Sequence, residues 1–231
     1  MKRILISGLV ALVIALAAHS LRAQGTMTYL SSLSQTSTGS PLLGSNLWLA
    51  APFGTGTNAG GYKLDSIQLG MADASGSPSN FTVMIYSAIT FGAIYPQSSL
   101  GTLSGSLNPT TAGVYTFTPV LNLTLSPNTD YFIVLTAGTT VANGAYSWDM
   151  STFPPSSSGN WGELNVLLQS GDGISGWSPT PDVDIGQFAI NATAIPEPGV
   201  LSLFALGGLA FLWHRRKTKA VFSRSISPSH L

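Results

Sequence analysis

The residues that could carry acid–base or metal chemistry are unevenly placed along this chain. Its three histidines, His19, His214 and His230, all lie near the two ends, and it has no cysteine. A Ser-His-Asp or Cys-His site needs an imidazole, and a zinc site needs histidine or cysteine ligands. The stretch from Gln24 to Ile195 also has no arginine, and therefore no bidentate clamp for a phosphate or a carboxylate. We expect a body that is not an enzyme.

Carboxylates are the remaining reactive groups of the body. A glycosidase needs two facing acids, and Glu163 could pair with Asp149, Asp172, Asp182 or Asp184. Scattered acids of this kind are more simply solvated surface groups or turn caps. Asp182 and Asp184 share one side of an extended segment, and with Asp172 they offer hard oxygen ligands for a structural Ca²⁺, without the twelve-residue loop of an EF-hand. No other cofactor is expected.

Aromatic side chains gather late in the body. Tyr146, Trp148, Trp161 and Trp177 lie near amide and carboxylate side chains. Such rings can stack on sugars, which would make the body a carbohydrate-binding module for an extracellular polysaccharide. The alternative is that the same rings fill the core between sheets. Exposure of the rings on one face distinguishes the two.

A glycine-rich stretch at residues 54–60 is the one segment that resembles a phosphate loop in composition. It lacks the lysine and the following helix that a phosphate loop uses to hold its ligand. We interpret it as a turn.

The body is strongly acidic although the whole chain has a formal net charge of zero. Between Gln24 and Ile195 there is one base, Lys63, against eight acids, a net charge of −7. Nucleic acids and anionic lipid head groups need basic residues to neutralise phosphate. We therefore expect no nucleic-acid partner.

Short alternating segments punctuated by Gly, Pro, Asn and Ser predict an all-β body. Residues 24–45 are predicted to be a leader or an edge strand, and residues 46–194 a double-sheet, jelly-roll-like β-sandwich, with an immunoglobulin-type sandwich as the alternative. We expect loops at 73–80, a looser segment at 94–103, and either a strand or a short helix at 161–169. The predicted strands span residues 46–53, 62–71, 81–86, 114–118, 120–125, 130–136, 144–150 and 184–193.

The N-terminal end has the composition of a secretory signal. Lys2 and Arg3 precede an apolar run that reaches Ala18, and Leu21-Arg22-Ala23 offers a cleavage site. We expect a signal-peptide helix within residues 1–23, and hence an exported protein.

The C-terminal end joins an extended segment, an apolar run and a basic cluster. Pro196-Glu197-Pro198-Gly199 should be extended because proline disfavours helix in the preceding residue. Residues 200–213 carry no charge and predict a short transmembrane helix, shorter than the ~20 residues of a typical span. Arg215, Arg216 and Lys217 then predict a cytoplasmic side, with residues 218–231 as a cytoplasmic tail.

This order of parts resembles the PEP-CTERM sorting signal of exported bacterial proteins, over residues 195–217. The same tail is also described as the C-terminal domain of ice-binding proteins. The resemblance implies recognition by an exosortase, an intramembrane-type cysteine transpeptidase, with the membrane as a second partner. It also implies a cell-envelope location, anchored before processing and then at the outer surface or extracellular.

The body has a second resemblance. Residues 125–135, Tyr146-Ser147-Trp148 and Phe188-Ala189-Ile190 resemble the bacterial choice-of-anchor domains, most closely the group labelled R. That group carries no known catalytic residues. It implies an adhesive or structural protein of the cell surface or biofilm matrix.

Overall fold

The computed structural model describes residues 25–152, 154–162, 164–181 and 184–197. The chain divides into two compact units, Gln24–Ile195 and a second unit of Met1–Ala23 with Pro196–Leu231. The first unit is described below. The predicted signal-peptide helix, the predicted membrane helix at 200–213 and the predicted cytoplasmic tail lie outside the described residues. Within the described residues, no helix is long and apolar enough to cross a membrane.

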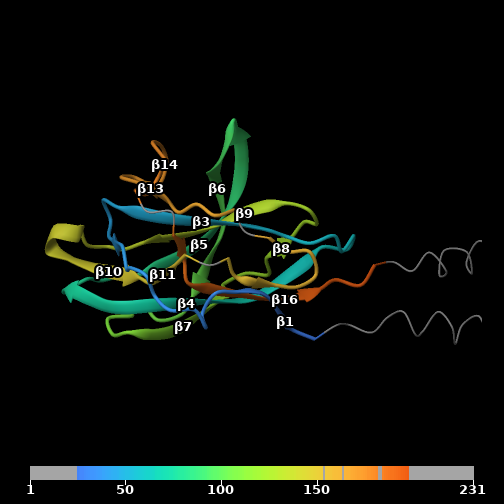
Figure 1. Ribbon diagram of the computed structural model, residues 1–231, viewed down its shortest axis with the longest axis horizontal. Helices are drawn as coiled ribbons and strands as arrows, with labels where there is room; N and C mark the ends of the chain where they lie inside the picture. Colours follow the sequence, from blue (N-terminus) through green and yellow to red (C-terminus); the bar gives the residue numbers. More distant parts are fainter. Residues whose placement is uncertain (1–24, 153, 163, 182–183, 198–231) are drawn as a thin grey trace, which may run out of the picture. The chain divides into compact units, whose positions relative to one another are not determined.

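The first unit is nearly all β, and its strands pair antiparallel, as predicted (Figure 1). One 14-stranded sheet curls on itself, and a two-stranded sheet lies beside it. The main path runs, in order, β12 (Ser156–Ser157), β1 (Met27–Ser31), β16 (Phe188–Ala194), β4 (Tyr62–Gly76), β7 (Gly113–Pro119), β6 (Ala93–Ser104), β5 (Thr82–Phe91), β9 (Asp130–Thr136), β3 (Trp48–Gly54), β13 (Leu168–Ser170) and β14 (Ser178–Pro179).

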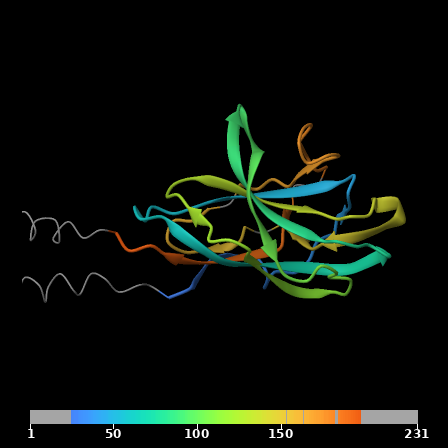
Figure 2. The same cartoon turned by 180° about the vertical axis from the view of Figure 1, so that it is seen from behind.

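Short elements complete the unit. Strand β10 (Gly144–Trp148) pairs with β2 (Leu42–Leu43) and β4, and β8 (Thr124–Leu125) also pairs with β4. The small sheet joins β11 (Met150–Ser151) to β15 (Ile185–Gly186), and η2 (Val141–Asn143) is a single 3₁₀ turn. The paired ends of β5 and β6 rise from the rest as a hairpin arm, which both views show (Figure 2).

The curl brings two halves of the sheet over one core. The halves join where β6 pairs with β7, at Leu103 and Ser104 alone. Their inner faces alternate with outward residues, as the pleat of a strand requires. One apolar cluster therefore takes side chains from both halves, among them Phe53, Val83, Ile133 and Leu135 from one half and Leu64, Ile67, Phe117 and Ile190 from the other.

Strand β9 is buried on both faces, which accounts for its near-continuous apolar sequence. Ile133 and Leu135 face the main core, while Phe132 and Val134 lie in a second cluster on the outer face. The turn before β9 has Asn128 in the left-handed region at φ 47°, which asparagine tolerates.

Two segments that the sequence predicts as irregular form strands in part or in full. Strand β4 continues into the predicted loop at 73–80 as far as Gly76, because β10 pairs with it from Gly144 onward. Strand β6 is continuous across the looser segment at 94–103, and Pro96 is tolerated because β7 pairs with β6 only at Leu103 and Ser104. Tertiary pairing outweighs weak local β propensity in both places.

The predicted strand at 120–125 is wrong over most of its length. Only Thr124 and Leu125 form β8, and Val120 and Leu121 are 62% and 81% exposed. Alternation in the sequence does not reveal whether a neighbouring strand is available for pairing. Here β4 pairs with β8 at two residues. The ambiguous segment at 161–169 contributes only the start of β13.

Candidate functional site

The body ends at β16, its last strand, which is flanked by β1, the first described strand, and by β4, the longest strand. Strand β16 lies between β1 and β4, and its final residues pair Ala192 with Met27 and Ala194 with Tyr62. Because β1 and β16 are antiparallel, the start of one lies beside the end of the other (Figure 1). Both chain ends therefore leave this unit at the same edge of the sheet, the one formed by the ends of these strands.

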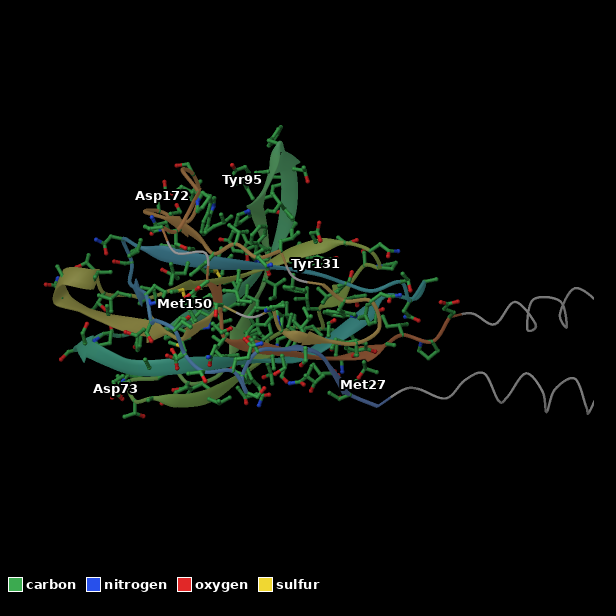
Figure 3. All side chains as sticks on the ribbon, in the orientation of Figure 1. Met27, Asp73, Tyr95, Tyr131, Met150 and Asp172 are labelled. Carbon is green, nitrogen blue, oxygen red and sulfur yellow. The ribbon has the colours of Figure 1, made fainter. Side chains whose placement is uncertain are left out.

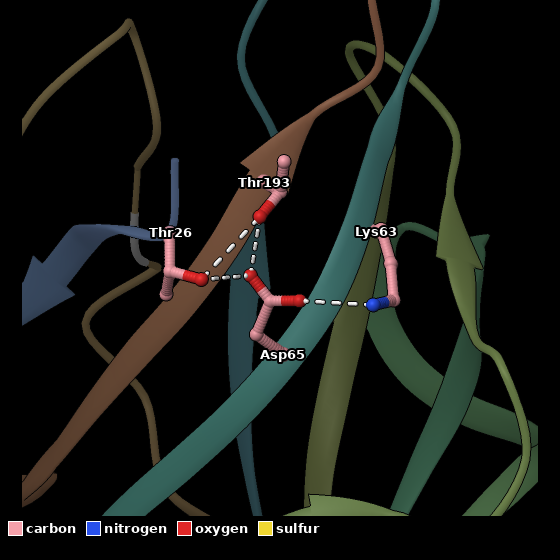
Figure 4. Close-up of polar contacts among 4 residues, drawn as sticks. All are labelled: Thr26, Lys63, Asp65 and Thr193. Atoms are coloured by element: carbon pink, nitrogen blue, oxygen red, sulfur yellow. Dashed lines mark hydrogen bonds and ion pairs between the residues drawn. The ribbon is translucent and has the colours of Figure 1, made fainter. Parts of the chain in front are cut away.

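Asp65 on β4 fastens the two strands together at that edge (Figure 4). Its Oδ2 accepts hydrogen bonds from the hydroxyl of Thr26, at 2.8 Å, and from the hydroxyl of Thr193, at 2.6 Å. Its Oδ1 lies 3.5 Å from the ammonium of Lys63. Lys63 is more than half exposed, so the ion pair adds little, whereas the hydrogen bonds to the carboxylate hold β16 in register.

Two residues after Thr193, a turn of the glycine-rich segment binds the backbone of Ile195. The N–H of Ile195 donates to the carbonyl of Gly61 at 3.0 Å. The side-chain amide of Asn58 donates to the carbonyl of Ile195 at 2.9 Å and to that of Gly61 at 2.6 Å. Both backbone polar groups of Ile195 are thus bonded to the body. We call Asn58, Gly60 and Gly61 the Ile195 seat.

The seat depends on two glycines that bring the backbone close. A Cβ on Gly60 would lie 2.3 Å from the carbonyl oxygen of Ile195. Gly61 has φ 74°, in the left-handed region, and a Cβ there would lie 2.5 Å from the carbonyl oxygen of Leu125. The glycine-rich stretch that the sequence excludes as a phosphate loop therefore serves to admit the last residue of the body.

A surface pocket of about 370 Å³ lies beside the seat. Its lining includes Asn58, Tyr62, Ser158, Asn160 and Ala194, and no charged side chain. Tyr29 lines the pocket and stacks on Trp161, with ring centroids 4.8 Å apart. Burial raises the pKa of the Tyr29 phenol, and the neighbouring Tyr62 raises it further.

Three of the four aromatic residues considered for sugar contact lie in the core. Tyr146 and Trp148 are fully buried, and Trp161 is 3% exposed. The indole N–H of Trp148 donates to the carbonyl of Gln187 at 2.9 Å, and the Tyr146 hydroxyl lies within hydrogen-bond distance of the Leu107 carbonyl. Each of these three rings packs within the main core cluster, as in the core alternative that the sequence left open.

Trp177 lies apart from those three rings. It is half-buried and packs against the second cluster on the outer face, with Trp48 and Tyr95. Figure 3 shows Tyr95 on the hairpin arm, well away from Met27 at the edge where β1 begins. The four rings do not form one surface.

Asp172, one of the three acids considered for calcium, caps a turn. Asp172, between β13 and β14 (Figure 3), accepts hydrogen bonds from the backbone N–H groups of Ser175 and Ile174, both at 2.9 Å, and from the hydroxyls of Ser175 and Ser170. The backbone N–H of Ser175, then that of Ile174, hold the pKa of Asp172 far below its ordinary value. The carboxylate is satisfied by its own loop.

Asp184 holds a different segment. It is 9% exposed and accepts a hydrogen bond from the Thr38 hydroxyl at 2.5 Å. Asp149 accepts from the hydroxyls of Ser37 and Ser40, so both acids fix the stretch before β2. Asp182 and Glu163 lie outside the described residues. Among those described, no three acidic or histidine side chains gather as a metal site would need.

The predicted sorting motif begins directly after Ile195 in the chain. Pro196 and Glu197 are described and exposed, and they follow Ile195 without a spacer. Pro198, Gly199, Arg215, Arg216 and Lys217 lie outside the described residues. Sequence reasoning missed Asn58, Asp65 and Thr193, because each is common in surface turns and strands and only the pairing of β1, β4 and β16 brings them to one edge.

Comparison with known families gives one match and one negative result. A model described as the PEP-CTERM protein-sorting motif matches residues 194–217. A comparison with curated proteins gives no significant match, so the choice-of-anchor resemblance of the body stays a prediction. The matched residues begin at Ala194, the last residue of β16. The motif indicates an exported protein of the cell envelope that is sorted with the help of an exosortase.

Proposed function

We propose that this chain is a non-enzymatic envelope or extracellular-matrix protein, whose body an exosortase separates from its C-terminal segment. The observation that carries the proposal is the junction at Ile195. Both backbone polar groups of Ile195 are hydrogen-bonded to the body, and the matched sorting segment, residues 194–217, continues along the chain from there. Cleavage after the junction would leave a complete body, as release or re-anchoring requires.

The body's role is adhesive or structural in this proposal. Its sequence has no histidine, cysteine or arginine between Gln24 and Ile195. Asp149, Asp172 and Asp184 each accept hydrogen bonds from serine or threonine hydroxyls, which suits fixing loops better than proton transfer. We assign the curled sheet to the double-sheet sandwiches, whose two faces bury one core.

The proposed route has three steps. A signal peptide within residues 1–23 directs export, and residues 200–213 then hold the precursor in the membrane. The exosortase recognises Pro196-Glu197-Pro198 and releases or re-anchors the body at the outer surface.

Motif variants test the route. In the native host, the double variant Pro196→Ala and Glu197→Ala should accumulate as an unprocessed precursor in the membrane fraction, while wild type leaves it. Asp73→Ala, a body variant outside the motif, controls for general effects of substitution. Equal fractionation and equal mass of wild type and the motif variant would contradict the proposal.

A further inference from the structure

The Ile195 seat bears on how the processing enzyme reaches its motif. A protease or transpeptidase usually binds its substrate as an extended strand through backbone hydrogen bonds. The N–H and carbonyl of Ile195 are already bonded to Gly61 and Asn58. The residues before it are paired in β16, up to Ala194 opposite Tyr62. The enzyme therefore meets no unpaired backbone before Pro196.

We infer that Asn58, Gly60 and Gly61 are positioning residues for sorting, which set Pro196 as the first residue open to the processing enzyme. This inference rests on the proposed function. With the seat closed, the residue that precedes the motif in the chain is held by the body, which limits how much of the chain before Pro196 the enzyme can engage. Opening the seat, or moving it away from the motif, should speed processing.

The chemistry of the seat indicates which changes would open it. Asn58→Asp keeps the shape of the side chain but replaces its amide donor with an acceptor facing two carbonyl oxygens, those of Gly61 and Ile195. Gly60→Ala places a methyl group where the Ile195 carbonyl oxygen lies, 2.3 Å away. Both changes act at Ile195 and leave the motif sequence intact.

The test is a pulse–chase of the full chain in its native host, which follows conversion of precursor to processed protein by mass. The first variant carries a short Gly-Ser spacer between Ile195 and Pro196, which leaves the seat intact and moves it away. The others are Asn58→Asp and Gly60→Ala. Their matched controls are Asn46→Asp, where the side-chain oxygen that accepts from Val141 N–H is kept, and Gly101→Ala, where a Cβ meets nothing within 4 Å.

We expect both seat variants to raise the conversion rate about two- to tenfold, the range by which losing one hydrogen bond shifts an opening equilibrium. The spacer, which keeps the seat closed but moves it away from the motif, should also raise the conversion rate. The controls should convert like wild type. In the spacer background, Asn58→Asp should add nothing, because the seat no longer adjoins the motif. Amide hydrogen exchange at Ile195 should quicken in Asn58→Asp while exchange in β9 stays unchanged.

Two results would overturn the inference. Conversion that is unchanged or slower with the spacer would show that the seat does not limit the enzyme. An equal acceleration by Asn58→Asp with and without the spacer would mean that the residue acts only through body stability. If wild type and the Glu197→Ala variant are both left unconverted, the proposed function itself fails, and the inference with it.

Discussion

Thr193 on β16 donates a hydrogen bond of 2.6 Å to Asp65 on β4, two residues before the chain leaves the body. The same carboxylate oxygen accepts from Thr26, the residue directly before β1. A single side chain thus fastens both ends of this unit to its longest strand. The strand next to the sorting segment is held in register by a charge-assisted bond as well as by its backbone ladder.

Loss of this bond should weaken the body by a measurable amount. We expect Thr193→Val to lower the free energy of unfolding by about 1–2 kcal/mol, because Asp65 is part-buried and loses one of its donors. Urea unfolding of the two proteins measures the difference. In an Asp65→Asn background the same substitution should cost less, since the charged acceptor is gone.

Thr118→Val is the matched control. Thr118 is an exposed residue of β7, and the structure shows no hydrogen bond from its hydroxyl to other described residues. A loss at Thr118 as large as that at Thr193 would show that the effect belongs to strand threonines in general.

The junction predicts where the body can be shortened without damage. A chain that ends at Ile195 should keep the thermal stability of the longer protein. A chain that ends at Ala192 loses the Thr193 bond, the pairing of Ala194 with Tyr62 and the Ile195 seat. We expect a loss of about 2–5 kcal/mol, the sum of several net hydrogen bonds. Calorimetry of the two truncations would contradict the account if they melt together.

Trp148 should behave as a core residue. It is fully buried, so Trp148→Ala is expected to cost about 3–5 kcal/mol, whereas Trp177→Ala, at a half-buried ring, should cost less. Gly186→Ala tests the same packing from the other side, because its Cβ would lie 2.3 Å from the Trp148 ring. Overpacking of this kind costs about 1–3 kcal/mol.

Gly162→Ala provides the comparison, since a Cβ there meets nothing within 4 Å. The denaturant concentration at the midpoint of unfolding, measured for each variant, ranks their stabilities. Full stability in Trp148→Ala, together with loss of binding to a polysaccharide, would restore the sugar-platform hypothesis.

Acid should release the loop that Asp172 caps. The N–H groups of Ser175 and Ile174 hold the pKa of the folded-state carboxyl below its ordinary value. The resulting stabilisation is fully present above the pKa of the unfolded chain, about 3.9, and is lost as the pH falls through the lower folded-state pKa. The loop should therefore stay ordered at neutral pH and loosen only in strong acid.

The indole of Trp48 reports this transition. The loop packs on it, because a Cβ on Gly173 would lie within 2.5 Å of three of its ring atoms. The indole N–H resonance should shift in acid in the wild type and lose that step in Asp172→Asn. An acid step of the same size in the variant would assign the transition to another group.

Much of the architecture could be predicted from local pattern. The strand at residues 130–136 was predicted with its observed bounds. It is a near-continuous run of apolar residues, buried on both faces, and it follows residues whose types favour a turn. The segment at 120–125 alternates and forms a strand only at Thr124 and Leu125, because β4 pairs with it only at Tyr62 and Lys63. Period-2 pattern predicts that a strand is feasible, and the partner decides whether it forms.

The candidate site could be predicted only in its linear part. Pro196 and Glu197 belong to a motif that is defined by the order of residues along the chain, so the motif was identified without a structure. Asn58 and Asp65 acquire their roles from pairing with residues more than a hundred positions away, at Ile195 and Thr193. The sequence left the aromatic residues open between core and sugar contact for a related reason, since the same ring types serve in a core and on a sugar platform.

The most direct test of the account is the intact mass of the protein from the native envelope. The account predicts a mass that lacks residues 1–23 and the apolar and basic part of the matched segment, with a body that retains Ile195. A mature protein that still contains residues 200–231 would contradict processing at the junction and leave a tethered β-domain in its place.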